Sequence, residues 1–185
     1  MPVPQDSEPF QRTEVSAHLR PQLRLYRRLY LTSIDLDEAK ATVEELLSRR
    51  IPLPRRKPPS ALLMSLTTAL VVAYARPFVN SRGQSEVADK TVPGVLLRVF
   101  SRDERELHDA LLEIRNKEMA HADAEALEIS IRLIKGGDVG IFRVPRRPFQ
   151  VRTLRAVKRM LQKLEHTLDQ RCEELRAELP NEVWL

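Results

Sequence analysis

The feature that most constrains the fold is a stripe of apolar residues in the last third of the chain, repeated at steps of three or four. The stripe consists of Leu154, Val157, Leu161, Leu164, Leu168, Cys172, Leu175 and Leu179. Such steps place side chains on one face of an α-helix, because the helix has about 3.6 residues per turn. The sequence therefore predicts a long amphipathic helix that ends near the C-terminus and packs against other helices.

Two more helices are expected in the first half of the chain. Apolar residues recur at helical spacing from Ser33 to about Arg50, whereas Pro21 is expected to limit the helical stretch before them. Ser60 is a candidate N-cap for an apolar helix over 61–78, which Pro77 should end or kink. Because that helix is apolar on nearly every face, we expect it in the middle of a bundle.

A fourth helix is predicted to begin at Ser101 and to reach about His121. Ser101 with Glu104 three residues later has the pattern of a capping box. Segment 51–59 contains four prolines and three basic residues, so we expect an exposed, extended connection there.

A short β-hairpin is predicted between the fourth helix and the C-terminal one. Segments 127–134 and 139–144 alternate apolar and polar residues around Gly136 and Gly137. The predicted fold is therefore all-α: an up-and-down bundle of four to five helices with a small hairpin before the long C-terminal helix. We expect residues 1–14 to be a loose N-terminal arm and 15–185 to be a single domain.

Composition excludes several classes of protein. The chain has 185 residues and 42% apolar content, but one Cys and five Gly. A single Cys excludes an intramolecular disulfide framework, and neither a Walker A nor a GxGxxG pattern is present. No signal peptide is visible, and the apolar run 61–75 is shorter than the roughly 20 residues that span a membrane. We expect a cytoplasmic protein with no membrane segment, no metal site and no cofactor.

The basic residues are concentrated in two segments. The formal net charge is +5, yet 143–159 carries seven basic residues and no acidic one, and a second group surrounds Arg55, Arg56 and Lys57. These clusters are either a phosphate-binding surface or a solvated basic face. Nine basic residues, including Arg76 outside these clusters, are candidate phosphate contacts: Arg55, Arg56, Lys57, Arg76, Arg143, Arg146, Arg147, Arg155 and Arg159.

The residues best suited to chemistry are Arg115, Asn116 and His121, at the end of the fourth predicted helix. Arginine is a permanently charged, forked phosphate ligand, and histidine exchanges a proton near neutral pH. On an uninterrupted α-helix, the six-residue step from Arg115 to His121 leaves a net angle of about 240°, so the two would not share a face. They converge if the helix ends near His121, or if a second copy of the chain supplies one of them. The structural alternative is that both residues only stabilise a helix C-terminus.

The string from Arg115 to His121, on the penultimate major helix of an all-α chain, resembles the motif of the HEPN superfamily: an Arg, commonly followed by a polar residue, with a His four to six positions later. Two other strings look like the abortive-infection U-type branch of that superfamily. They are Tyr-Ala-Arg-Pro-Phe at 74–78 and Ala-His-Ala-Asp at 120–123. The resemblance covers about residues 35–175.

The resemblance implies a homodimer in which two copies of the motif face each other across a cleft. It also implies a metal-independent endoribonuclease of a phage-defence or toxin–antitoxin system. His121 would move the proton of the ribose 2′-hydroxyl or of the leaving oxygen, Arg115 would stabilise the phosphate charge, and Asn116 would orient the phosphate. RNA would then be the partner of the basic clusters. Any antitoxin or defence partner is expected on a separate chain, since no nucleotidyltransferase-like segment is visible.

A rival interpretation is a non-catalytic helical module that binds nucleotide, RNA or protein, because some members of the superfamily only bind. Three other side chains admit two readings each. His108 is expected to be a surface residue beside Asp109, rather than a second proton carrier. Tyr74 and Arg76 either reach a substrate phosphate or are structural, with Arg76 satisfying carbonyl groups at the Pro77 break.

Overall fold

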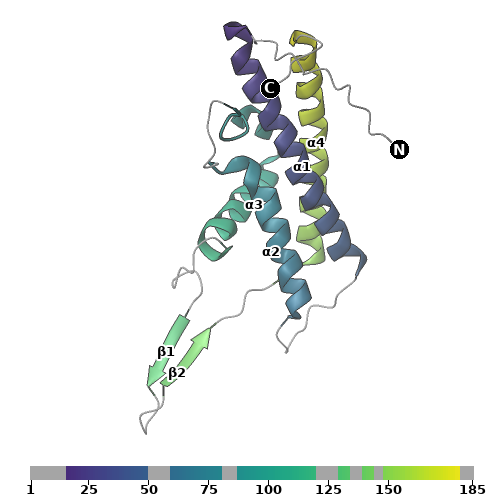
Figure 1. Cartoon of the computed structure of the whole chain (residues 1–185). Helices are drawn as coiled ribbons and strands as arrows, with labels where there is room; N and C mark the ends of the chain where they lie inside the picture. The colour runs from purple at the N-terminus through teal and green to yellow at the C-terminus, as the bar shows by residue number, and fades with distance from the viewer. Residues whose placement is uncertain are drawn as a thin grey trace, which may run out of the picture.

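The computed structural model describes residues 16–49, 59–80, 87–119, 129–133, 139–143 and 148–179. Within these residues four α-helices form a bundle, so the predicted all-α class is confirmed (Figure 1). They are α1 (Arg20–Ser48), α2 (Ala61–Ala75), α3 (Arg102–Ile114) and α4 (Val151–Glu178). Short 3₁₀ turns are η1 (Ala17–Leu19), η2 (Arg76–Phe78) and η3 (Gly94–Val99), and a π-helical turn, η4 (Arg115–Met119), follows α3.

Helix α1 is a single helix of 29 residues, which corrects the expected start near Ser33. Pro21 lies in the first turn of α1, where its missing N–H would have no partner inside the helix anyway. Proline therefore begins this helix instead of limiting it.

The predicted start and end of α2 are confirmed. Ser60 is the N-cap, and its hydroxyl oxygen accepts a hydrogen bond from the Leu63 N–H over 3.2 Å. Regular α-helix ends at Ala75, and the chain continues into η2, which contains Pro77. The backbone changes from α to 3₁₀ geometry here because Pro77 has no N–H to donate to a hydrogen bond of the α-helix.

The capping box at the start of α3 is confirmed as well. The Ser101 hydroxyl accepts from the Glu104 N–H over 3.3 Å, while Glu104 accepts from the Ser101 N–H over 2.8 Å. Glu104 also accepts from Lys163 of α4 over 2.7 Å. The cap therefore fixes both the start of α3 and its position beside α4.

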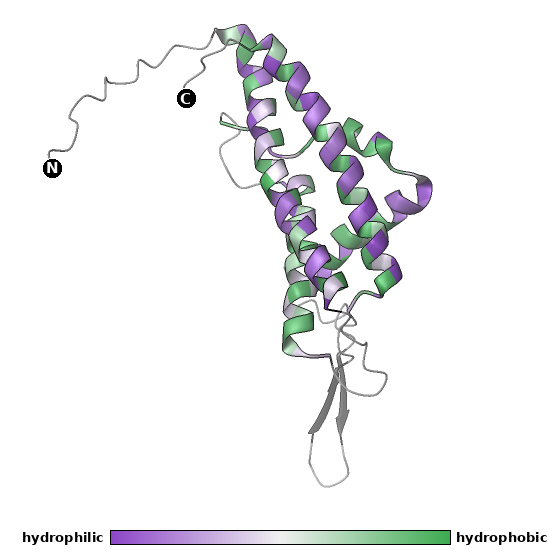
Figure 2. Cartoon of the chain, turned by 90° about the vertical axis from the view of Figure 1, so that its right-hand side faces the viewer, coloured by the Kyte–Doolittle hydropathy of each residue, from purple (hydrophilic) through white to green (hydrophobic). Residues whose placement is uncertain are grey.

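The core lies where α1, α2 and α4 meet, with α3 packed on α2. In Figure 1, α1 and α4 run side by side as the two long helices of the bundle. The predicted stripe of α4 is buried at Leu154, Val157, Leu161, Leu164, Leu168 and Leu175. Hydrophilic and hydrophobic bands alternate along the helices in Figure 2, as expected for helices with one face in a core.

Two strands lie between η4 and α4 in the chain. Strand β1 (Ile129–Leu133) pairs antiparallel with β2 (Val139–Arg143), and Ile131 is opposite Ile141. In Figure 1 the two strands lie below the helices.

One segment of the described chain is long and apolar enough to cross a membrane. It is Ala61–Phe78, with a mean hydropathy of 1.4, and 44% of it is buried within the bundle. A buried core helix has the same composition as a membrane span, so this segment is weak evidence for a membrane protein. The expectation of a chain without a membrane segment remains a prediction.

Candidate nucleic-acid interface and the Arg115 turn

Arg115 and Asn116 begin the π-helical turn η4, directly after the last residue of α3. The Arg115 N–H is shared between the carbonyl oxygens of Leu111 and Leu112, and one Arg115 guanidinium N–H donates to Asn116 Oδ1 over 3.0 Å. The α-helix is therefore interrupted within the predicted motif, and the angle calculated for an uninterrupted helix does not apply. Single π-helical turns are frequent at functional sites.

Arg115 is partly exposed, and its guanidinium has no carboxylate partner within the described part of the chain. The neighbouring Lys117 pairs with Glu113 over 2.7 Å, and this contact lowers the pKa of Glu113. Within the described residues, no carboxylate competes with an anion for Arg115. His121 lies outside the described residues, so the predicted grouping of Arg115, Asn116 and His121 remains a prediction.

His108 is buried with 4% of its surface exposed, which corrects the expected surface position. Its Nδ1 lies 2.9 Å from the Tyr74 hydroxyl, and the rings of Phe78, Phe100 and Tyr74 surround it. The physical reason is the packing of α3 on α2, which turns the face carrying His108 and Leu111 inward.

Burial keeps both partners of this pair neutral. Desolvation lowers the pKa of His108, although the nearby Asp109 opposes the shift, and burial raises the pKa of Tyr74. The pair therefore connects α2 to α3. His108 lies one helical turn before Leu112 and two turns before Arg115. Its geometry is that of a structural contact which positions η4.

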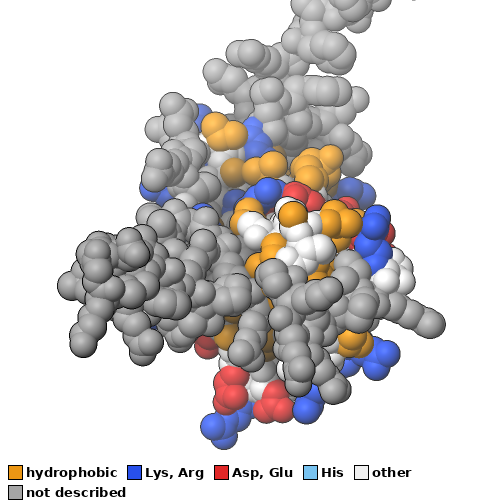
Figure 3. Space-filling model, turned by 90° about the horizontal axis from the view of Figure 1, so that it is seen from below, with side chains coloured by type: hydrophobic (Ala, Val, Ile, Leu, Met, Phe, Trp, Pro, Cys, Tyr) orange, Lys and Arg blue, Asp and Glu red, His pale blue; other side chains and the backbone are white. Residues whose placement is uncertain are grey.

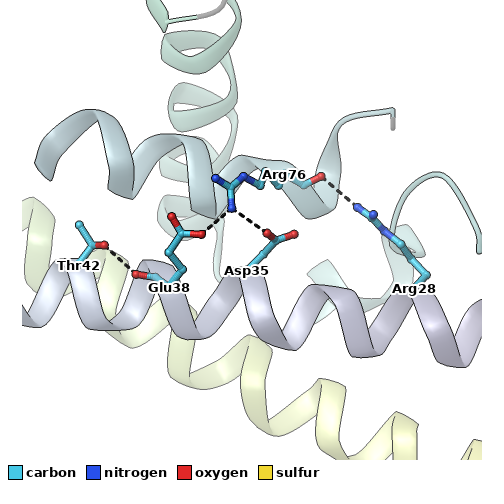
Figure 4. Close-up of polar contacts among 5 residues, drawn as sticks. All are labelled: Arg28, Asp35, Glu38, Thr42 and Arg76. Carbon is cyan, nitrogen blue, oxygen red and sulfur yellow. Dashed lines mark hydrogen bonds and ion pairs between the residues drawn. The ribbon is translucent and has the colours of Figure 1, made fainter. Parts of the chain in front are cut away.

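Arg76 is held by two carboxylates of α1, as Figure 4 shows. Its guanidinium lies 3.2 Å from Asp35 and 2.5 Å from Glu38. The hydrogen bond to Glu38 raises the pKa of Arg76, while burial raises the pKa of Asp35. A phosphate group would have to compete with both carboxylates for this guanidinium.

The carbonyl groups at the Pro77 break are satisfied by a residue that sequence reasoning missed. Arg28 of α1 donates to the carbonyl oxygens of Arg76 and Pro77 over 3.0 and 2.8 Å. The structural role considered for Arg76 therefore belongs to Arg28, which is 5% exposed. No local pattern signals this contact, because it joins residues 48 and 49 positions apart.

Helix α4 presents three basic side chains on its outward face. Arg152, Arg155 and Arg159 are exposed and follow each other at steps of three and four, so they share one face. No ion pair in the described part of the chain involves them. Lys158, on a different face, instead pairs with Glu44 of α1 over 2.8 Å.

An open pocket of about 340 Å³ lies between the start of α3 and the start of α4. Its lining consists of Ser101, Asp103, Glu104, Leu107, Arg152, Thr153, Ala156 and Arg159. Arg152 was not among the candidate contacts, although its spacing to Arg155 and Arg159 is readable from the sequence. Seen from below in Figure 3, the described basic side chains occur at several separate points instead of one patch.

The remaining candidate contacts are not placed by the structure. Arg55, Arg56, Lys57, Arg146 and Arg147 lie outside the described residues, and Arg143 is the last residue of β2. Within the described part of the chain, no group of three or more His, Cys, Asp or Glu residues is arranged to hold a metal ion. No protein-family model, curated protein or solved structure matches this chain.

Proposed function

We propose that this chain is a HEPN-like RNA-binding protein that acts as a metal-independent endoribonuclease in phage defence or a toxin–antitoxin system. The observation that carries the RNA-binding part is the exposed group of Arg152, Arg155 and Arg159 on one face of α4, with no carboxylate paired to it in the described chain. A guanidinium group that is already paired with a carboxylate gains little free energy from contact with a phosphate. Contacts of these three arginines with RNA phosphates would release the counterions that are condensed on the RNA.

The cleavage step is proposed for the residues at η4 and after it. The ribose 2′-oxygen attacks the phosphorus, a P–O2′ bond forms, and the P–O5′ bond breaks, which leaves a 2′,3′-cyclic phosphate and a free 5′-hydroxyl. His121 moves one of the two protons, either by accepting that of the 2′-hydroxyl or by donating one to the leaving 5′-oxygen, and solvent carries the other. Arg115 stabilises the charge on the phosphate and Asn116 orients it. This step needs no metal-bound water, because the nucleophile is part of the RNA.

We also propose that the protein works in the cytoplasm as a homodimer, and that an antitoxin or defence partner is a separate chain. Residues 15–185 would act as one up-and-down domain in which β1 and β2 form the hairpin before α4, with Arg143 at its end. The rival proposal is a non-catalytic module that binds RNA through the same arginines. The contact of Arg115 with Asn116, without a carboxylate partner for Arg115 in the described chain, supports the enzyme.

RNA binding is tested by its salt dependence. Replacing Arg152, Arg155 and Arg159 by Gln should reduce the slope of log affinity against log salt by about 2, since each phosphate contact to a single strand contributes roughly 0.7. The matched control removes three cations that are paired within the chain, namely Arg49, Arg102 and Arg171. Equal slopes for the two triple variants would remove the α4 arginines from the interface.

Cleavage is tested with total RNA in EDTA. The wild-type protein should give products with a 2′,3′-cyclic phosphate, and His121→Ala and Arg115→Ala should abolish them. RNA binding that persists in His121→Ala, with no cleavage by the wild type, would support the non-catalytic module instead.

A further inference from the structure

The pocket between the start of α3 and the start of α4 carries charges of both signs that do not pair with each other. Arg152 and Arg159 of α4 line it, and so does Asp103 of α3. None of the three takes part in an ion pair within the described part of the chain. Opposite charges that line one pocket without touching leave room for a ligand that contacts both.

The other carboxylate of the pocket already has partners. Glu104 accepts hydrogen bonds from Lys163 over 2.7 Å and from the Ser101 N–H over 2.8 Å. Desolvation acts to raise the pKa of Glu104, but these contacts outweigh it and lower that pKa, so Glu104 stays ionised and paired. Among the described lining residues, Asp103 is therefore the carboxylate left to accept hydrogen bonds from a ligand.

The wall between these charges is apolar. Arg152, Ala156 and Arg159 follow each other on α4 at steps of four and three, so they share one face. Leu107, one turn after Asp103, lines the pocket from α3, and both Leu107 and Ala156 are half-buried. The volume of about 340 Å³ is within the range of small-molecule sites, roughly 300–1,000 Å³. A flat ring that packs on the apolar wall and has polar edges fits this arrangement.

Asp103 determines which ring fits. It lies in the first turn of α3, where the helix dipole favours an ionised carboxylate. A carboxylate only accepts hydrogen bonds, so it selects an edge with adjacent donors. Guanine has such an edge, since its N1–H and its N2 amino group lie side by side. Adenine, cytosine and uracil each place an acceptor beside the donor on that edge and would repel the carboxylate.

We propose that this pocket binds one guanine nucleotide of a single-stranded RNA, with Asp103 on the base edge and Arg152 and Arg159 on the flanking phosphates. Two helical turns, about 10 Å, separate the two arginines, so they reach phosphates on both sides of one nucleotide. The proposal rests on the RNA binding proposed for α4 and adds base specificity to it. Asp103 lies 12 residues before Arg115, about 18 Å along the helix, so this site selects RNA and is separate from the cleavage residues.

Other ligands use only part of the pocket. Inorganic phosphate or an anionic lipid headgroup would contact the arginines but would meet the carboxylate of Asp103 as a like charge. A basic peptide would pair with Asp103 but would be repelled by two guanidinium groups. A guanine nucleotide matches both signs at once, whether it is free or part of an RNA, and the two experiments separate these sources.

The first experiment titrates the full chain with guanosine 5′-monophosphate (GMP) and with the adenosine, cytidine and uridine monophosphates by isothermal titration calorimetry. GMP should bind at least about tenfold more tightly than the other three, as expected for a bidentate contact to the correct base edge. Asp103→Asn should remove this preference, because an amide presents a donor where the carboxylate accepts. The matched control is Asp109→Asn, which removes the same charge from an exposed position of α3 outside the pocket and should keep the preference. Circular dichroism checks that both variants fold.

The second experiment compares two RNAs of equal length by fluorescence anisotropy at one salt concentration. One is an all-uridine strand, and the other is the same strand with one central guanine. The wild type should bind the guanine-containing RNA at least about fivefold more tightly, and Asp103→Asn should bind the two RNAs with equal affinity. Arg152→Gln should weaken the binding of both RNAs, since it removes a phosphate contact and leaves Asp103 in place.

The outcomes separate this proposal from the proposed function. Equal affinities of the wild type for the four nucleotides, or a guanine preference that survives Asp103→Asn, would overturn the guanine site. RNA binding without any base preference would overturn it as well and would leave the proposed RNA binding intact. A preference for GMP with no binding of either RNA would assign the pocket to a free nucleotide and would contradict the proposed function.

Discussion

The imidazole of His108 is enclosed by aromatic rings, and the contact to the Tyr74 hydroxyl is the one hydrogen bond described for it. The charged groups near it are Asp109, which favours protonation, and Arg105, which opposes it. Desolvation has the largest effect on the pKa of His108 and lowers it below its ordinary value of 6.5. The folded protein therefore binds the proton of this side chain less well than the unfolded chain does.

This difference predicts a pH dependence of stability. Below about pH 6.5 the unfolded chain takes up a proton at His108 that the folded protein resists, so the free energy of unfolding should fall as the pH is lowered towards 5. His108→Gln should flatten this dependence in urea unfolding followed by circular dichroism. His166→Gln, at an exposed position on α4, should keep the wild-type dependence. Parallel curves for the wild type and His108→Gln would show that His108 is not the group responsible.

The elements of the fold follow from local sequence signals to different degrees. Ser60, Ser101 and Pro77 act within one or two turns of their own position, and their effects on α2 and α3 were predictable. The effect of Pro21 was predicted wrongly. Proline is tolerated in the first turn of a helix but breaks its interior, and the sequence does not say which of these positions Pro21 occupies. The π-helical turn at Arg115 was not predictable, since apolar spacing reports only the average helical period.

Contacts between elements were the hardest part of the structure to predict from the sequence. Arg28 of α1 has no local motif, yet it holds the break after α2 through the Arg76 and Pro77 carbonyl groups. Likewise, His108 has a polar neighbour in the sequence and is buried only because α2 packs against it. Tertiary packing, not the local pattern, decides both positions.

The link between α1 and η2 gives a prediction at the scale of elements. Arg28→Met should lower the free energy of unfolding by about 1–3 kcal/mol, because the buried Pro77 carbonyl oxygen and the partly buried Arg76 carbonyl oxygen lose their donor while the apolar bulk is kept. Arg27→Met is the matched control, since Arg27 donates to one carbonyl oxygen in an exposed contact and should cost less than about 1 kcal/mol. Urea unfolding measures both variants. Equal losses would mean that Arg28 does not hold the break.

For the whole molecule, the positions of the charges say more about which cations are free to bind an anion than the net charge does. The net charge of +5 does not distinguish paired from unpaired cations. The structure shows Arg76 and Lys158 in ion pairs with α1, whereas Arg155 and Arg159 have no such partner in the described chain. The basic segment of α4 could be predicted from the sequence. Which of its cations are paired could not, because the ion pair of Lys158 forms only when α1 packs beside α4.

The proposed homodimer and the α4 arginines together predict avidity. Two joined copies carry two sets of Arg152, Arg155 and Arg159, and an RNA long enough to reach both sets binds the second one intramolecularly. The wild type should therefore bind a long single-stranded RNA at least about tenfold more tightly than an RNA too short to reach both sets. Fluorescence anisotropy at one fixed salt concentration measures both RNAs. Equal affinities of the wild type for the long and the short RNA would show that each chain binds RNA separately.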